Sequence, residues 1–166
     1  MHLYINIIEY LEVSTIYAIT PTYARATQRV DLISICHTLM HVPNITWIVV
    51  EDSEKKTQPV KDILTKQCKY VTSVHLTAKS SKNKAGGRGI NQRNAGLSWI
   101  RQKCGSNTTT METECKGVVY LMDDDNKYDL RLFQEVGLRA QVVQSSYIAM
   151  VMNRPHNWGM PERAPH

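Results

Sequence analysis

Short apolar runs alternate with amphipathic segments along most of this chain. Runs rich in β-branched residues indicate buried strands over residues 15–20, 46–50, 70–76 and 118–122. Segments with helical spacing of apolar residues cover residues 25–41, 60–68, 91–101 and 130–136. Strands that alternate with helices predict an α/β fold with a mostly parallel sheet and right-handed connections.

The first predicted helix has a candidate core face. Its apolar stripe is expected to run through Val30, Ile33, Cys36 or His37, and Met40. Further apolar residues lie beside this stripe: Leu32, Ile35 and Leu39. At the other end of the chain, residues 142–152 fit either a strand or a helix.

Size and charge narrow the class of protein only slightly. With 166 residues, 42% of them hydrophobic and 21% charged, the chain suits one domain with a substantial core. The net charge of +5 suits a polyanionic partner such as a nucleotide phosphate, a sulfated glycan or nucleic acid. Charge alone does not choose among these partners.

Targeting signals point in two directions. Residues 1–20 are apolar but contain Glu9 and Glu12, so we expect neither a membrane anchor nor a clear signal peptide. Two N-glycosylation acceptor patterns, at Asn44 and Asn107, point instead to the secretory lumen.

The cysteines do not have metal-finger spacing. A disulfide between Cys104 and Cys115 would close the polar loop between them. The alternative is four reduced thiols, with Cys36 inside a helix, and this is the expectation we carry forward.

Three adjacent carboxylates end the last predicted strand. Asp123, Asp124 and Asp125 repel one another, and ligands of α/β sheets usually bind at strand ends. Two interpretations stay open at this point. The triplet is either a solvated acidic turn before a helix with Asp129 as its N-cap, or part of a site for a hard divalent cation.

Other predicted strand ends also carry groups that suit a nucleotide. Tyr23 offers an aromatic face for a base, although a tyrosine after a strand is more often a packing residue. Asp52 offers an acceptor for a base N–H, and Arg88 and Arg93 offer guanidinium groups for phosphate oxygens. The P-loop, GxGxxG, GxSxG and HExxH patterns are absent from the sequence.

Four ordered strings resemble the animal β-1,3-glucuronosyltransferases, which include the enzymes that complete the proteoglycan linker tetrasaccharide. They cover residues 15–25, 47–52, 88–94 and 117–126. The resemblance implies the Rossmann-like donor half of a GT-A glycosyltransferase, over residues 13–136. Residues 137–166 diverge from the family, and we expect them to form a partly disordered tail.

The resemblance also implies an activity. Family members transfer glucuronic acid from UDP-glucuronate to a terminal galactose of a glycan, with inversion and with Mn²⁺ as the cofactor. They form homodimers and reside in the Golgi membrane, facing the lumen.

The family's nucleoside-binding roles map onto five positions. Pro21, Thr22 and Tyr23 would line the uracil pocket, with Tyr23 stacking on the base. Asp52 would hold the uracil edge, and Arg88 would contact the nucleoside.

The remaining roles concern the sugar, the phosphates and the metal. Arg93 would contact the phosphates, and Asp123 and Asp124 would hold the ribose and neighbouring groups. Asp125 would bind Mn²⁺, which would hold the diphosphate.

No catalytic base is expected in this chain. In the family a glutamate on the acceptor-binding half takes the proton, and we expect that half to be missing here. Glu162 belongs to the proline-rich tail and Glu135 to a helix. The alternative function is therefore a truncated, non-catalytic form that binds UDP and Mn²⁺ or a protein partner.

A nucleic-acid partner is not expected. The basic loop before the third helix lacks the aromatic residues that single-strand binders interleave with basic ones. The basic residues concerned are Lys79, Lys82, Lys84, Arg88 and Arg93.

Overall fold

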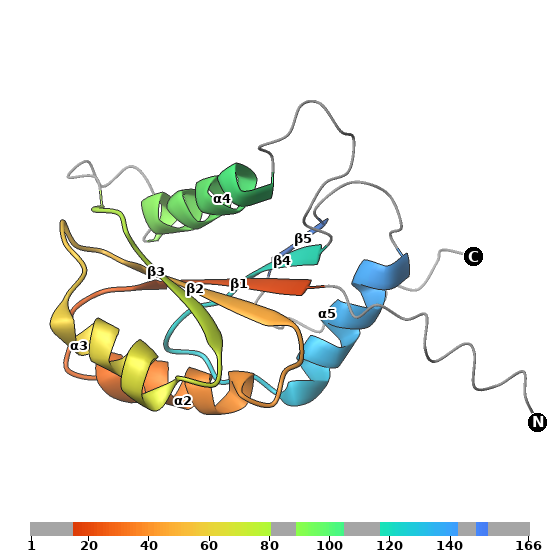
Figure 1. The fold of residues 1–166 in the computed structure, drawn as a ribbon, viewed down its shortest axis with the longest axis horizontal. Helices are drawn as coiled ribbons and strands as arrows, with labels where there is room; N and C mark the ends of the chain where they lie inside the picture. The colour runs from red at the N-terminus through yellow and green to blue at the C-terminus, as the bar shows by residue number, and fades with distance from the viewer. Residues whose placement is uncertain (1–14, 81–88, 105–116, 143–148, 153–166) are drawn as a thin grey trace, which may run out of the picture.

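A five-stranded parallel sheet forms the centre of the protein in the computed structural model, which describes residues 15–80, 89–104, 117–142 and 149–152 (Figure 1). The strand order is β3-β2-β1-β4-β5, and every neighbouring pair is parallel. The strands are β1 (Thr15–Thr22), β2 (Ile45–Glu51), β3 (Thr72–Thr77), β4 (Gly117–Leu121) and β5 (Ala149–Met152). The predicted α/β, Rossmann-like fold is confirmed.

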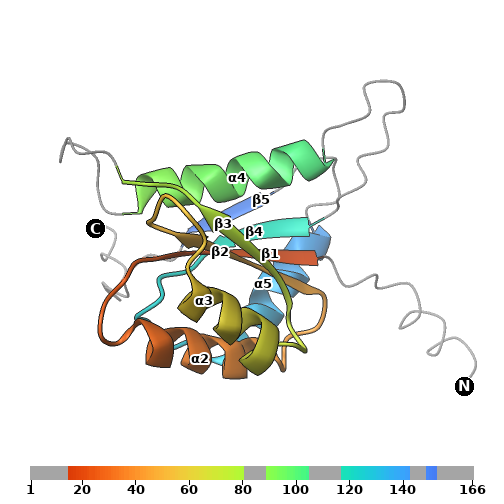
Figure 2. The ribbon, with the colours of Figure 1, turned by 60° about the vertical axis from the view of Figure 1, so that its left-hand side comes forward.

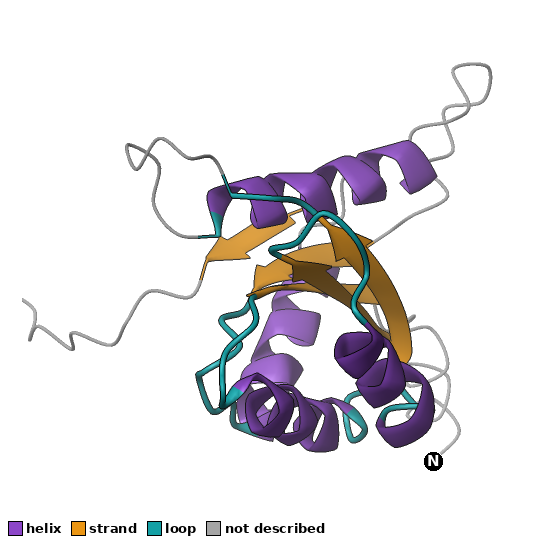
Figure 3. Cartoon of the chain, turned by 90° about the vertical axis from the view of Figure 1, so that its left-hand side faces the viewer, coloured by secondary structure: helices purple, strands orange, loops and turns teal. Residues whose placement is uncertain are grey.

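Helices cover both faces of the sheet. The helices α2 (Gln28–Leu39), α3 (Gln58–Asp62) and α5 (Leu130–Val142) lie on one face, and α3 continues into the π-helical turn η1 (Ile63–Gln67). The other face is covered by α4 (Ile90–Cys104), as Figure 2 and the end-on view in Figure 3 show. None of the helices in the described ranges is both long enough and apolar enough to span a membrane.

Alternating side chains of the strands fill two cores. Ile16 and Ala18 of β1 belong to the core beneath α2 and α5, whereas Tyr17 and Ile19 face α4. Gly96 lies where α4 crosses β1, because a Cβ atom there would come within 2.7 Å of the Ile19 side chain. The absence of a side chain at position 96 therefore sets how closely α4 approaches the sheet.

The predicted core stripe of the first helix was wrong at Val30 and Met40, whereas Cys36 is buried and Ile33 packs against the core. Val30 is 66% exposed and Met40 is 38% exposed. The buried face of α2 instead consists of Gln28, Leu32, Ile35, Cys36 and Leu39. Apolar residues surround most of this helix, so spacing alone permits more than one stripe, and packing against η1 and the sheet selects this one.

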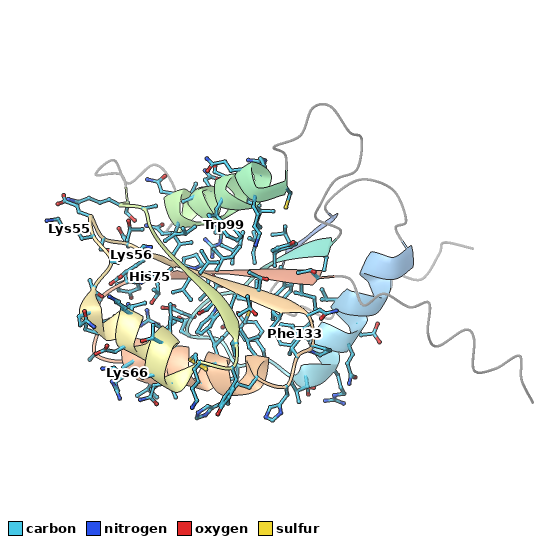
Figure 4. All side chains as sticks on the ribbon, in the orientation of Figure 1. Lys55, Lys56, Lys66, His75, Trp99 and Phe133 are labelled. Atoms are coloured by element: carbon cyan, nitrogen blue, oxygen red, sulfur yellow. A yellow bond between two sulfur atoms is a disulfide. The ribbon has the colours of Figure 1, made fainter. Side chains whose placement is uncertain are left out.

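The expectation of four reduced thiols was also wrong. Cys36 of α2 and Cys68, which follows η1, form a disulfide with Cα atoms 5.8 Å apart, seen as a yellow bond in Figure 4. Both residues are fully buried. Cys104 is also disulfide-bonded, whereas Cys115 lies outside the described residues.

The C-terminal region contributes to the sheet. Helix α5 extends to Val142, six residues beyond the predicted end at Val136. Residues 149–152 form β5, which pairs in parallel with β4. The sequence left a strand and a helix open for residues 142–152, and the strand is confirmed for residues 149–152.

Candidate functional site

The candidate site lies where the direction of chain winding reverses. The chain passes outward from β1 through β2 to β3, and then returns through α4 to place β4 on the other side of β1. In open α/β sheets, ligands bind at the carboxyl ends of the strands at such a point. Residues 23–25 follow β1 and residues 123–125 follow β4, and the two segments meet there.

Arg25 connects three segments of this edge. Its guanidinium donates from Nη1 to Asp124 Oδ2 at 2.6 Å and from Nη2 to Asp31 Oδ2 at 2.9 Å. Its Nε donates to Thr27 Oγ1 at 3.0 Å. The hydrogen bond to Asp124 raises the pKa of Arg25 further above its ordinary value. Asp124 is only 7% exposed, so its charge is balanced inside the protein rather than by solvent.

Arg93 balances the preceding carboxylate. Its Nη2 forms an ion pair with Asp123 Oδ1. Gly89, with a φ of 81°, makes room for this arginine, because a Cβ there would lie 2.7 Å from Arg93 Nη1 and 3.3 Å from Pro21 Cβ. The start of α4 therefore meets the ends of β1 and β4.

The backbone of the carboxylate turn is held by Tyr128. The Asp123 N–H donates to the Tyr128 hydroxyl oxygen at 2.7 Å, and that hydroxyl donates to the Asp123 carbonyl oxygen at 2.9 Å. The Tyr128 ring packs with Tyr120 and with Phe133, which is labelled in Figure 4, at centroid distances of 6.2 and 6.3 Å. Burial raises the pKa of Tyr128, so the hydroxyl stays protonated and able to donate.

Asp125 differs from its two neighbours. It is exposed, and within the described part of the chain its side chain has neither a hydrogen bond nor an ion pair. The same ranges hold no cluster of three or more His, Cys, Asp or Glu residues able to enclose a metal ion. A cation at Asp125 would therefore need additional oxygen ligands from a bound molecule or water.

The acidic-turn interpretation is confirmed in one respect. Asp129 Oδ1 accepts a hydrogen bond from the backbone N–H of Arg131 at 2.9 Å, as an N-cap of α5 does. The Arg131 side chain, through its hydrogen bond to Asp129, lowers the pKa of Asp129 to about 2. Capping by Asp129 leaves the Asp125 carboxylate available.

Asp52 is fixed beside the end of β1. Its Oδ1 accepts from the Ser80 N–H at 2.7 Å, and its Oδ2 accepts from Ser80 Oγ at 2.5 Å. The Asp52 N–H donates to the Thr22 carbonyl at 2.7 Å. Gln92 Nε2 donates to Ser80 Oγ at 3.2 Å, which ties α4 to the same group.

Thr22 and Tyr23 point in different directions. Thr22 is 2% exposed, and its hydroxyl oxygen accepts from Gln28 Nε2 at 3.1 Å. Tyr23 is 47% exposed, and its ring centroid lies 4.8 Å from the Arg25 guanidinium carbon. The Tyr23 ring thus offers an accessible aromatic surface at the same edge.

Glu51, which precedes Asp52, has a structural position. It is 1% exposed and accepts from the Thr57 N–H at 3.0 Å and from Thr57 Oγ1 at 2.5 Å. His75, labelled on β3 in Figure 4, places Nε2 2.9 Å from Glu51 Oε2. This carboxylate fixes the loop after β2 and faces away from solvent.

The structure gathers most of the predicted site residues at one edge. Direct contacts join Thr22 to Asp52, and Arg93 to Asp123, while Gly89 brings Arg93 beside Pro21. Arg88 lies outside the described residues, as does Asn107, whereas Asn44 is exposed in the turn before β2. Sequence reasoning did not assign a role to Arg25, Ser80 or Gln92, because their contacts join segments far apart in the chain.

Strand order, helix placement and strand-end chemistry together define a Rossmann-like α/β domain. The family model of glycosyltransferase family 43 matches residues 35–153. The chain belongs to glycosyltransferase family 43, which confirms the resemblance found in the sequence.

Similar curated proteins have names that agree with this family. The chain is 42% identical over 130 residues to the galactosylgalactosylxylosylprotein 3-beta-glucuronosyltransferase sqv-8 of Caenorhabditis elegans, covering 73% of this chain and 34% of that protein. It is 39% identical over 132 residues to mouse galactosylgalactosylxylosylprotein 3-beta-glucuronosyltransferase 3, covering 74% and 39%. Human galactosylgalactosylxylosylprotein 3-beta-glucuronosyltransferase 1 is 36% identical over 129 residues, covering 74% and 37%. The chain thus spans between 34% and 39% of the length of these relatives.

Proposed function

We propose that this chain is the donor-binding part of a β-1,3-glucuronosyltransferase and binds UDP-glucuronate together with Mn²⁺. The observation that carries the proposal is the division of the carboxylate triplet. Arg93 is paired with Asp123 and Arg25 with Asp124, while Asp125 is exposed without an ion pair in the described part of the chain. A hard oxygen ligand next to two charge-balanced ones suits a divalent cation that also takes diphosphate oxygens.

The other groups of the edge have roles in this proposal. Tyr23 stacks on the uracil, and Asp52, oriented by Ser80, accepts from the uracil N–H. Arg93, in the first turn of α4, pairs with Asp123 at the end of β4, and there its guanidinium group would contact phosphate oxygens. Mn²⁺ bound at Asp125 would supply Lewis-acid stabilisation of the UDP leaving group.

The proposed reaction places glucuronate on a terminal galactose of a glycan, with inversion. The names of the similar proteins support the class of sugar that is transferred. In this reaction a base takes the proton from the acceptor hydroxyl while UDP leaves. The site residues described above bind and orient the donor, and none of them is assigned as that base.

We also propose the Golgi lumen as the location. A buried disulfide between Cys36 and Cys68 suits an oxidising compartment. The exposed position of Asn44 in the turn before β2 makes the first glycosylation pattern accessible.

Calorimetric titration of UDP into the purified chain, with and without Mn²⁺, tests the donor site. We expect binding that requires Mn²⁺, and an affinity at least about tenfold weaker in Asp125→Asn, because loss of even an outer-shell partner of a metal costs that much. Glu135→Gln removes an exposed carboxylate from α5 and serves as the matched control. UDP binding that is indifferent to Mn²⁺ or to Asp125→Asn would contradict the metal assignment.

A transfer assay separates the two candidate functions. The purified chain is incubated with UDP-glucuronate, Mn²⁺ and a galactose-terminated acceptor. Glucuronate transfer supports the enzyme, whereas Mn²⁺-dependent UDP binding without transfer supports the non-catalytic donor-binding module.

A further inference from the structure

One guanidinium group lies between the two halves of the proposed site. Arg25 is the neighbour of the half-exposed Tyr23 ring on one side and of the buried Asp124 carboxylate on the other. The Arg25 side chain itself is only 17% exposed. Its Nε donates to Thr27 and its Nη2 donates to Asp31, both at the start of α2.

The arrangement is stiff because the guanidinium is planar. Arginine presents five N–H donors in a fixed fork, so the directions of its bonds to Asp124, Asp31 and Thr27 also fix the plane beside Tyr23. A shift of the carboxylate turn would break the 2.6 Å bond to Asp124 or rotate the guanidinium. Rotation would change its contact with the Tyr23 ring.

We propose that Arg25 is a positioning residue that couples nucleoside binding at Tyr23 to cation binding at the carboxylate turn. This inference rests on the proposed function, because it needs the base and the cation to bind at these two places. The coupling passes from Asp125 through the backbone to Asp124, then through Arg25 to Tyr23. Arg25 needs no contact with either ligand for this role.

Coupling and charge balance make different demands on the side chain. A residue that only neutralises Asp124 is replaceable by lysine, whose ammonium is also positive. A residue that must hold a planar group beside the Tyr23 ring is not replaceable by lysine, because lysine lacks the planar fork. Arg25→Lys therefore distinguishes the two roles.

Uridine and Mn²⁺ alone are the probes that isolate the coupling. Uridine has no phosphate to bridge to the cation, so an effect of Mn²⁺ on uridine affinity must pass through the protein. We expect saturating Mn²⁺ to raise the uridine affinity of the wild-type chain about fivefold, the lower end of usual coupling between two sites. The coupling ratio is the uridine affinity with saturating Mn²⁺ divided by the affinity without Mn²⁺, both measured by calorimetry. In Arg25→Lys we expect this ratio to fall to about one, and we expect uridine to raise the Mn²⁺ affinity equally little.

Two further variants keep this result interpretable. The double variant Arg25→Met with Asp124→Asn removes both charges of the buried pair, and only the partly exposed Asp31 loses an ion pair, so this variant carries the test if Arg25→Lys does not fold. It should also show a ratio of about one. The control is Arg131→Lys, which alters the exposed Arg131–Asp129 pair near the same turn and should keep the wild-type ratio.

The outcomes separate the inference from the proposed function. A wild-type chain that fails to bind UDP with Mn²⁺ overturns both. A wild-type chain that binds UDP with Mn²⁺ overturns the inference alone if Mn²⁺ leaves its uridine affinity unchanged. The inference is equally overturned if either folded Arg25 variant retains the wild-type ratio, with folding confirmed by circular dichroism and a cooperative melt.

Discussion

Adjacent aspartates after β4 have three different electrostatic environments. Asp123 is half-exposed and paired with Arg93, whereas Asp124 is buried and paired with Arg25. Asp125 is exposed and, among the described residues, has no ion pair. Two paired carboxylates remove most of the repulsion that the triplet would otherwise create, and the third keeps its charge for a ligand.

The space occupied by Arg93 yields a prediction at position 89. Gly89→Ala places a methyl group 2.7 Å from Arg93 Nη1 and adds strain at a φ of 81°. We expect Mn²⁺-dependent UDP affinity to fall about tenfold, equivalent to roughly 1.4 kcal/mol, as Arg93 is displaced. Stability should fall by about 1–2 kcal/mol from the left-handed backbone alone.

The matched control for this change is Gly137→Ala in α5. A Cβ at position 137 meets no atom within 4 Å. It should leave UDP binding unchanged and raise the free energy of unfolding by about 0.5–1 kcal/mol, as alanine favours a helix interior. Equal UDP affinities of Gly89→Ala and wild type would show that Arg93 does not take part in binding.

Candidate residues in local strings could be proposed from the sequence, whereas their long-range partners could not. Pro21, Asp52 and Arg93 were proposed as site residues because each belongs to a short string at a strand end or a helix start, and the structure places them at one edge. Arg25 belongs to one of these strings too, but its partner Asp124 is 99 positions away. Only the strand order, which places β4 beside β1, brings the two together.

At the scale of elements, the pattern of strands and helices was predictable, but the packing of a single helix was not. Each predicted strand corresponds to an observed strand within a few residues, because buried parallel strands are continuous apolar runs. The buried face of α2 was misassigned because its apolar residues are not confined to one side. The disulfide was missed for a related reason: Cys36 and Cys68 are 32 residues apart and meet only after α2 and η1 pack.

The disulfide should contribute strongly to the stability of this helix layer. It closes a loop with a sequence separation of 32, for which the chain-entropy model gives about 3–4 kcal/mol. We expect the double variant Cys36→Ala with Cys68→Ala to lose about that much in urea unfolding. Alkylation of the folded, unreduced wild type should leave both positions unlabelled, and labelling of either would contradict the pairing.

At the scale of the whole molecule, arginine and lysine side chains hold several carboxylates in their charged form. A hydrogen bond from Thr27, followed by one from Arg25, lowers the pKa of Asp31. Hydrogen bonds from lysines lower the pKa of Glu54 and of Asp62, and Arg131 lowers that of Asp129 to about 2. Their positions near α2, α3, β3 and α5 spread this effect over the domain.

The direction of these pKa shifts determines how stability changes at low pH, which is the acid limb of the curve of stability against pH. A carboxylate whose pKa is lower in the folded state contributes its full stabilisation at pH values above its unfolded pKa, near 4, where it is charged in both states. Between the two pKa values the unfolded chain binds more protons, so stability falls with the pH there. That contribution is lost as the pH falls through the folded pKa, which for Asp129 is about 2. We therefore expect the midpoint temperature of thermal unfolding to hold steady above about pH 5 and to fall between about pH 4 and about pH 2.

Thermal melts across this range, at low and at high salt, test the expectation. Most of these pairs are exposed, so salt should lessen the drop contributed by Glu54, Asp62 and Asp129. Asp31 is different, because its partner Arg25 is also bonded to the buried Asp124, and its share should resist salt. At high salt, Asp31→Asn should therefore reduce the fall in midpoint temperature at low pH, whereas Asp62→Asn should leave the fall that remains at high salt unchanged. A limb that salt abolishes completely in the wild type would show that the Arg25 cluster adds no stability of its own.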